Sequence, residues 1–312
     1  MPFENLPAVV ALEALPVLTG TRRSASIQLS EKYLENRIAV LSALDIDPTS
    51  ERIDALRRSR RLLDTEVSIE SFDADAFLEA MNELRETYRR IPEVTFLQEN
   101  YPGTCIVVPE LVRNRNKIEF GARIYFHPED HAPKPREIVR RNVTAIVNDD
   151  EHAFDRYKGR IHGYPECCIA SFAERNSESP ERRSVASLET QVRADSIGTD
   201  ANVSIEDILP DFFATPAAYS FFSRQFYPEP QCHAAQSRGE EIYEELSNEL
   251  SEVVARDHFR LNYALCYTVT ASLGRGNGEL PAVGALGTEH IYHYLPLKNA
   301  LSIPRYNDES PE

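Results

Sequence analysis

The chain has 312 residues, 42% of them hydrophobic, which is enough to bury a sizeable core in one large domain or in two smaller ones. Acidic residues outnumber basic ones by 50 to 34, which gives a net charge of −16. This charge opposes nucleic-acid binding in dilute buffer, but not at molar salt, where the Debye length falls to about 3 Å. No apolar run reaches the roughly 18 residues of a membrane span, and the N-terminus lacks the basic start of a secretory signal, so we expect a cytoplasmic protein that does not enter a membrane.

The use of lysine and cysteine indicates the environment of the protein. Only five lysines occur, so arginine supplies nearly all of the positive charge. A large acidic excess with so few lysines is typical of salt-adapted, halophilic proteomes. The five cysteines are an odd number in a chain without an export signal, which favours reduced thiols over a disulfide framework.

The first third of the sequence predicts three helices. Ser30 precedes a stretch with an approximate apolar stripe, and Ser50 opens a second helix. Asp73 caps a third, in which apolar residues recur at steps of three and four until Pro92. The second helix carries a basic cluster, which consists of Arg57, Arg58, Arg60 and Arg61. This cluster either forms a solvated face paired with the surrounding acids or contacts phosphate groups.

The middle of the chain turns β-branched and aromatic, which predicts a β-hairpin of residues 104–109 and 117–127. A proline-interrupted connection follows and is the best candidate for a domain boundary. Beyond it, residues 138–147 fit either a helix or a buried strand. We therefore expect an α+β protein, mainly helical with a small β-hairpin or sheet. It would consist of an N-terminal region (1–130) and a cysteine-motif domain (135–312), or of one continuous domain.

The most distinctive string of the chain is GYPECC at residues 163–168, which a predicted helix of residues 151–161 precedes. Pro165 suits the first position of a second helix, so Cys167 and Cys168 should lie in its first turn. There the backbone amides and the helix dipole favour a thiolate, which is a better nucleophile and metal ligand than a thiol. The alternative is that the two thiols simply pack, since cysteine is among the most buried residue types.

A third cysteine lies where another turn enters a helix. The segment YPEPQCH ends at His233, and its two prolines end any preceding helix. A long stretch at residues 234–259 then reads as helical. Cys232 and His233 are therefore also expected at a helix N-terminus.

Together, the two strings resemble the archaeal family catalogued as domain of unknown function 483. The resemblance rests on GYPECC with Phe172, and on the stretch from Phe226 through Cys232, and it covers roughly residues 135–275. In that family the second stretch often reads Pro-Cys-x-Pro-x-Cys, which would complete a cluster of four cysteines. Here Glu229 stands near the first of those cysteines and only Cys232 matches.

The ligand set that this resemblance implies is a mixed one. It comprises Cys167, Cys168 and Cys232, supplemented by Glu229 or His233. Thiolates with a histidine suit zinc, and thiolate-rich sets suit an iron–sulfur cluster. Three thiols and one weaker ligand leave one exchangeable position, which is what a catalytic zinc or a substrate-binding cluster requires.

Three other functions are possible for this sequence. The partner that the protein binds is expected to be an unknown small molecule or RNA. In a metal-free thiol redox enzyme, one cysteine is the nucleophile, a second is the resolving thiol and a histidine, His162 or His233, is the base. The candidate catalytic residues are Cys167, His162 and Glu166. An RNA- or ribosome-associated protein would instead use the arginines against phosphates. These arginines are the cluster at 57–61 together with Arg136, Arg140 and Arg141. The third function is a purely structural zinc module with a closed set of four ligands.

Overall fold

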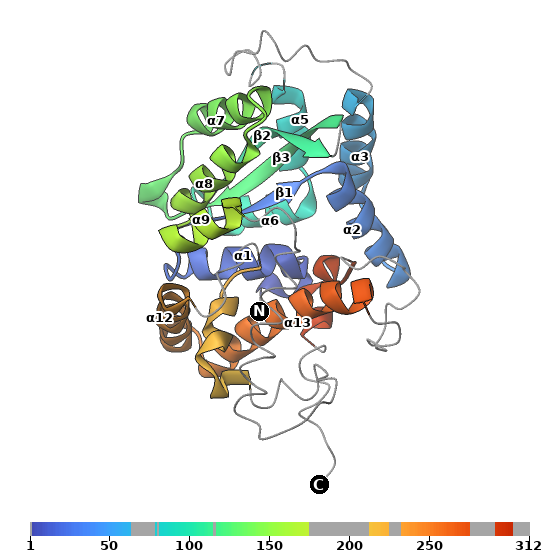
Figure 1. The fold of residues 1–312 in the computed structure, drawn as a ribbon. Helices are drawn as coiled ribbons and strands as arrows, with labels where there is room; N and C mark the ends of the chain where they lie inside the picture. Colours follow the sequence, from blue (N-terminus) through green and yellow to red (C-terminus); the bar gives the residue numbers. More distant parts are fainter. Residues whose placement is uncertain are drawn as a thin grey trace. The chain divides into compact units, whose positions relative to one another are not determined.

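A computed structural model describes residues 2–63, 79, 81–114, 117–174, 212–224, 232–274 and 291–301. The chain divides into two compact units, which we describe separately. The sheet unit comprises Arg22–Gly163, and the cysteine-motif unit comprises Met1–Thr21 and Tyr164–Glu312. The mainly helical α+β class is confirmed (Figure 1). Within the described residues, no helix combines the length and the apolar character that a membrane crossing requires.

Three antiparallel strands in the order β1-β3-β2 form the centre of the sheet unit. They are β1 (Ala25–Leu29), β2 (Cys105–Asn114) and β3 (Lys117–Phe126). The predicted hairpin is confirmed as β2–β3, in which Cys105 lies opposite Phe126 and Asn114 lies opposite Lys117. Its first strand is longer than predicted, because residues 111–114, expected in the turn, continue the ladder.

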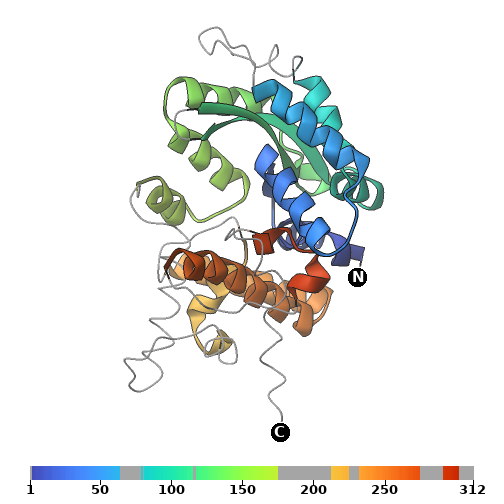
Figure 2. The same ribbon diagram turned by 90° about the vertical axis from the view of Figure 1, so that its right-hand side faces the viewer.

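Helices cover both faces of this sheet, with α7 and α8 on one side and α3 and α5 on the other (Figure 2). The helices are α2 (Glu31–Ala43), α3 (Ser50–Leu63), α5 (Asn82–Arg89), α6 (Pro92–Asn100), the 3₁₀ helix η3 (Glu129–His131), α7 (Pro135–Val147) and α8 (Glu151–Ile161). Residues 138–147, which fitted a helix or a strand, are thus helical. The division predicted between residues 130 and 135 lies inside this unit, because α7 packs against β2. The predicted cap at Asp73 lies outside the described residues.

The two faces of the sheet differ in polarity. One face is apolar and buried, and it carries Ala25, Ile27, Leu29, Cys105, Val107, Ile124 and Phe126. Burial raises the pKa of the Cys105 thiol to about 11, so this cysteine is a neutral core residue. Polar side chains gather on the other face, under α7 and α8, and they are Ser26, Gln28, Glu110, Arg123 and Tyr125.

The described elements of the cysteine-motif unit are helices, with one isolated β-bridge between Pro7 and Pro296. Its α-helices are α1 (Ala8–Leu18), α9 (Glu166–Glu174), α12 (His233–Glu249), α13 (Glu252–Gly274) and α14 (Leu297–Ala300). Its 3₁₀ helices are η1 (Pro2–Asn5), η4 (Phe212–Ala214), η5 (Pro216–Phe221) and η6 (Ile291–Tyr294). The single long helix predicted at residues 234–259 is two helices in the structure, because the backbone leaves helical geometry at Leu250. The Ser251 hydroxyl then caps α13 by accepting a hydrogen bond from the Val254 amide at 3.3 Å.

Aromatic side chains fill the core of this unit. Edge-to-face and tilted contacts join the rings of Phe212, Phe213, Tyr219, Phe221, Tyr243, Phe259 and Tyr263. Cys168 and Cys266 are buried in the same core. Helix α12 can approach η5 closely because Gly239, which has no side chain, faces the backbone of Tyr219. This contact fixes the position of α12 and of the cysteine at its start.

Candidate metal centre

The first two thiols lie at the beginning of helix α9. Gly163 makes the turn with a φ of 71°, a conformation that few other residues adopt. The Pro165 carbonyl then accepts the first helical hydrogen bonds, from the amides of Cys168 and Ile169 at 3.0 Å each. Pro165 therefore precedes the helix by one residue, and Cys167 and Cys168 occupy its first turn as predicted.

The third thiol lies at the beginning of helix α12. Cys232 is the N-cap residue of this helix, with extended backbone angles (φ −70°, ψ 105°). Its side chain makes no regular capping hydrogen bond, but the first-turn amides of α12 surround it. Two helix N-termini thus converge on one cluster of sulfur atoms.

The three sulfur atoms are mutual neighbours. The Sγ atoms of Cys167 and Cys232 are 3.4 Å apart, and those of Cys167, Cys168 and Cys232 all lie within 4.8 Å of one another. The predicted proximity of the two cysteine segments is confirmed. The side chains of adjacent helical residues point in directions about 100° apart, so Cys167 and Cys168 reach the cluster from different sides. Cys168 is 1% exposed and comes from the core, whereas Cys167 lies on the surface. All are free cysteines. The cluster could hold a metal ion.

The surroundings of Cys232 favour its thiolate. Partial burial by itself raises the pKa of this thiol. The backbone N–H of Ala235, the thiols of Cys168 and Cys167 and the N–H of Ala234 oppose this effect and bring the pKa below its ordinary value. The positive end of the α12 dipole acts in the same direction. These contacts therefore favour the ionised form of Cys232.

Two further candidate residues of this unit, the candidate ligand His233 and the candidate catalytic residue Glu166, do not join the three sulfurs within the described residues. Glu166 and His233 are exposed, in the first turns of α9 and α12, and neither belongs to the group whose ligand atoms lie within 4.8 Å of one another. Glu229 lies outside the described residues. The identity of a fourth ligand stays a prediction.

His162 belongs to the sheet unit and is 7% exposed. Its Nε2 lies 2.8 Å from the Ser26 hydroxyl and its Nδ1 lies 3.1 Å from the Ser24 hydroxyl. Burial lowers the pKa of this imidazole well below its ordinary value, and the charges of Arg22, Arg123 and Lys158 lower it further. Both ring nitrogens are engaged, which is a geometry typical of a positioned structural histidine; its role as a catalytic base stays a prediction.

A hydrogen-bonded chain that the sequence did not reveal supports the GYPECC string. Glu13 of α1 is fully buried and accepts hydrogen bonds from the Ser223 hydroxyl at 2.9 Å and from the Arg224 amide at 2.7 Å. The Tyr164 hydroxyl lies 3.2 Å from the same Ser223 oxygen. The chain therefore fixes the tyrosine that directly precedes Pro165. The one signal in the sequence was a single carboxylate inside the apolar stretch AVVALEALPVL.

Two arginines of each cluster are paired with acids in the described part of the chain. Arg57 lies 3.7 Å from Asp54, and Arg58 pairs with Glu83. On α7, Glu137 accepts from Arg140 at 2.8 Å and from Arg141 at 2.7 Å. This pairing fits the solvated-face interpretation, and RNA binding stays a prediction.

A scan against models of protein families found no match, and neither did searches of the curated proteins and of the solved structures. The geometry of the thiols is therefore the basis for a functional proposal.

Proposed function

We propose that Cys167, Cys168 and Cys232 bind a soft metal centre, either zinc or an iron–sulfur cluster, through their thiolates. The observation that carries this proposal is the convergence of three sulfurs within 4.8 Å of one another. Tetrahedral zinc with Zn–S bonds of about 2.3 Å separates its sulfur ligands by about 3.8 Å. The 3.4 Å between Cys167 and Cys232 is close to this separation, so small side-chain rotations suffice to admit an ion.

The helix termini supply the electrostatic part of the site. Three thiolates around one divalent ion carry a net negative charge, which the first-turn amides of α9 and α12 stabilise. Cys167 is exposed, so an ion bound here would be accessible from solvent. We propose that the fourth position is taken by His233, by Glu229 or by an exchangeable ligand, and an exchangeable ligand would permit catalysis. The GYPECC string also supports the proposal that the chain belongs to the domain of unknown function 483 family.

Metal analysis of a series of variants tests this proposal. The chain is purified without oxygen and without chelator, and metal per chain is measured together with the optical spectrum. Cys168→Ser and Cys232→Ser should lose most of the metal, because a serine hydroxyl stays protonated and is a poor ligand for a soft ion. Cys105→Ala and Cys266→Ala are matched controls, since both thiols are buried core residues, and they should keep the metal while costing about 1 kcal/mol of stability.

The results distinguish a zinc site from an iron–sulfur cluster, and they also show whether the proposal fails. Visible charge-transfer absorption with iron in the elemental analysis would identify a cluster, whereas a colourless protein with one zinc per chain would identify a mononuclear site. Full metal content in both serine variants, or a wild-type protein that never carries metal, would refute the proposal.

One observation also favours a second function, a metal-free thiol redox centre. Cys232 has a lowered pKa, and its sulfur already lies 3.4 Å from that of Cys167. The Cys232 thiolate would attack the disulfide of a substrate and release one substrate thiolate, which takes up a proton. Cys167 would then attack the mixed disulfide and release the second thiol, so that the substrate gains the two electrons that the cysteine pair loses. A Cys167→Ser variant should accumulate the mixed disulfide with a small disulfide such as oxidised glutathione; its absence by mass spectrometry would exclude this route.

A further inference from the structure

In the sheet unit, the polar face of the sheet borders a partly open cavity of about 110 Å³. Gln28 of β1, Glu110 of β2 and Arg123 of β3 line it from the sheet, and Asp155 and Lys158 of α8 line it from above. Most β-sheets that a helical layer covers are apolar on the covered face. The polar character of this face therefore needs an explanation.

A buried ion pair forms one end of the cavity. Arg123 donates to Glu110 through Nε at 2.8 Å and through Nη2 at 2.9 Å, and the two side chains are only 9% and 3% exposed. Burial alone would lower the pKa of Arg123, but the neighbouring Glu110 raises it above its ordinary value, so the guanidinium keeps its charge. Replacing such a pair by apolar residues is often neutral or stabilising, so stability alone does not explain it.

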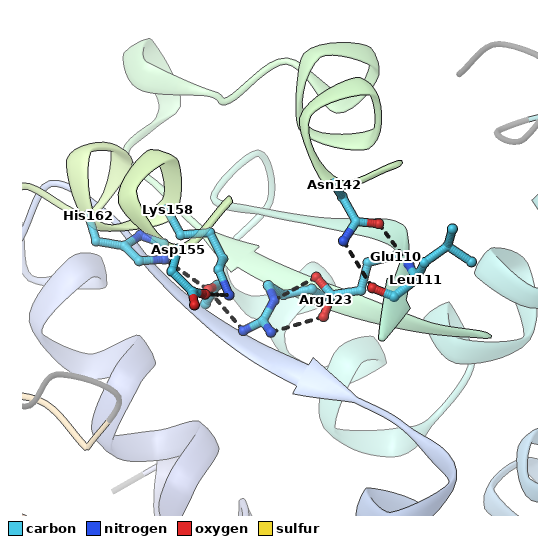
Figure 3. A network of polar contacts seen from close by, with 8 residues as sticks. Glu110, Leu111, Arg123, Asn142, Asp155, Lys158 and His162 are labelled. Atoms are coloured by element: carbon cyan, nitrogen blue, oxygen red, sulfur yellow. Dashed lines mark hydrogen bonds and ion pairs between the residues drawn. The ribbon is translucent and has the colours of Figure 1, made fainter. Parts of the chain in front are cut away.

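A second ion pair lies at the more exposed end. The Lys158 ammonium is 2.9 Å from Asp155, and these side chains are 20% and 32% exposed. Figure 3 shows Glu110, Arg123, Asp155 and Lys158 lined up along the cavity, between the helices and the strands. The lining thus contains two positive and two negative charges, with a net charge of zero.

Several hydrogen-bonding groups of this lining are unused within the described part of the chain. Lys158 has three N–H donors and uses one on Asp155, and the guanidinium of Arg123 has N–H groups beyond those on Glu110 and on the Ser26 hydroxyl at 3.4 Å. The side-chain amide of Gln28 makes no hydrogen bond to a described residue. In contrast, both polar atoms of the Asn142 side chain are engaged, because Oδ1 accepts from Leu111 N at 2.7 Å and Nδ2 donates to Leu111 O at 2.9 Å (Figure 3). Asn142 therefore holds α7 against the edge strand and is a fixed part of the wall.

The charges and the size of the cavity restrict what it can bind. A ligand with a net charge would bring an uncompensated charge into a partly buried site, and an apolar ligand would remove water from charged groups without replacing its hydrogen bonds. Hydrogen bonds with charge on both partners are roughly twice as strong as neutral ones, which favours a ligand with both a carboxylate and an ammonium group. Ala145, Ile146 and Phe154 add an apolar wall for a short aliphatic group. The volume corresponds to about four water molecules at roughly 30 Å³ each.

We propose that this cavity binds a small zwitterion of amino-acid size. The carboxylate of the ligand pairs with Lys158 and the unused N–H groups of Arg123, and its ammonium group pairs with Asp155 and Glu110. Gln28 contributes hydrogen bonds from β1. This site lies in the sheet unit and is independent of the proposed metal centre.

Binding to the full-length chain at one fixed salt concentration tests the proposal. Glycine, L-alanine and β-alanine are the zwitterionic probes, and propionate, ethylamine and glycerol are the matched probes with one charge or none. Calorimetric titration and the melting temperature should show saturable binding of at least one zwitterion, with a dissociation constant of the order of 1 mM. The matched probes should bind at least about tenfold more weakly.

Two variants and one control locate the site. Lys158→Met keeps the aliphatic stem over the Phe154 ring, which the ammonium approaches to 4.9 Å, and should weaken zwitterion binding about tenfold. Gln28→Leu removes a side-chain amide that makes no hydrogen bond to a described residue, so this variant should fold normally and also bind more weakly. Lys134→Met changes an exposed lysine of the same unit and should bind as the wild type does. The proposal is overturned if no zwitterion binds, if both cavity variants bind as tightly as the control, or if glycerol or propionate binds as tightly as the zwitterions.

Discussion

Replacing Gly239 by alanine should separate helix α12 from η5 and disturb the thiol cluster at the start of that helix. A Cβ atom at this position would lie 1.7 Å from the Tyr219 carbonyl oxygen and 2.6 Å from its carbon. Real Cβ contacts are almost never shorter than 3.0 Å, so the two elements would have to separate by about 1.3 Å. Because the obstacle is backbone, a side-chain rotation cannot remove it.

The magnitude follows from two opposing effects. Overpacking in a close contact costs about 1–3 kcal/mol, and the rigid carbonyl places this site at the upper end. Alanine in place of glycine within a helix returns about 1 kcal/mol. The net loss is about 2 kcal/mol, which corresponds to a fall in melting temperature of about 3 °C for a chain of 312 residues. A displaced α12 would also lengthen the 3.4 Å between the sulfurs of Cys167 and Cys232.

Thermal unfolding and the affinity for zinc are measured on Gly239→Ala beside a control, Ser237→Ala. Ser237 is exposed on the same helix, so its replacement should leave stability and affinity unchanged or slightly improve stability. Gly239→Ala should lower both quantities. A variant that melts at or above the wild-type temperature would show that the close approach of α12 and η5 does not hold this helix in place.

Three further outcomes are expected. The melting temperature should rise from low to molar potassium chloride, because salt screens the repulsion within a chain of net charge −16; a flat or falling curve would assign the acidic excess another cause. The pKa of His162 is lowered well below 6.5 in the folded chain, so below pH 6.5 the unfolded chain binds a proton at this residue that the folded chain excludes. The free energy of unfolding should therefore fall by up to about 1.4 kcal/mol per pH unit as the pH is lowered from 6.5 to 5. His162→Gln should flatten this dependence in urea titrations, whereas His131→Gln, at an exposed site, should not. Glu110→Gln should cost about 3–5 kcal/mol in the same assay, because it leaves the Arg123 charge buried without its partner, and a loss below 1 kcal/mol would contradict that.

Local signals in the sequence predicted the elements that depend on local chemistry. The Ser30 hydroxyl caps α2 by accepting from the Tyr33 amide at 3.3 Å, and the Asp150 carboxylate caps α8 by accepting from the Ala153 amide at 3.0 Å. Both helices begin within one residue of the predicted start. The hairpin was found because its strands are adjacent along the chain.

Elements that depend on distant partners were not predictable in the same way. Strand β1 has only five residues and pairs with β3, roughly a hundred residues later, so nothing near it in the sequence marks it as a strand. Helix α1 is buried around almost its whole circumference and contains Pro16, so it shows no amphipathic period. The polar cavity was missed for the same reason, since its polar and charged residues come from three strands and a helix that only the fold brings together.

The candidate metal centre depends both on local signals in the sequence and on partners that are distant along the chain. Cysteines at two turns that enter helices suggested a shared site, and the sequence supplied three of its groups, but it could not say which adjacent cysteine faces the core. The structure assigns that position to Cys168, which packs among apolar side chains including Phe222 and Ala235, whereas Cys167 reaches the same sulfur cluster from the surface. A buried thiol is fixed by its packing, which preorganises one ligand without a separate support. The exposed thiol is not held by packing in this way, so in the proposed metal centre Cys168 would be the fixed ligand and Cys167 the ligand that solvent can reach.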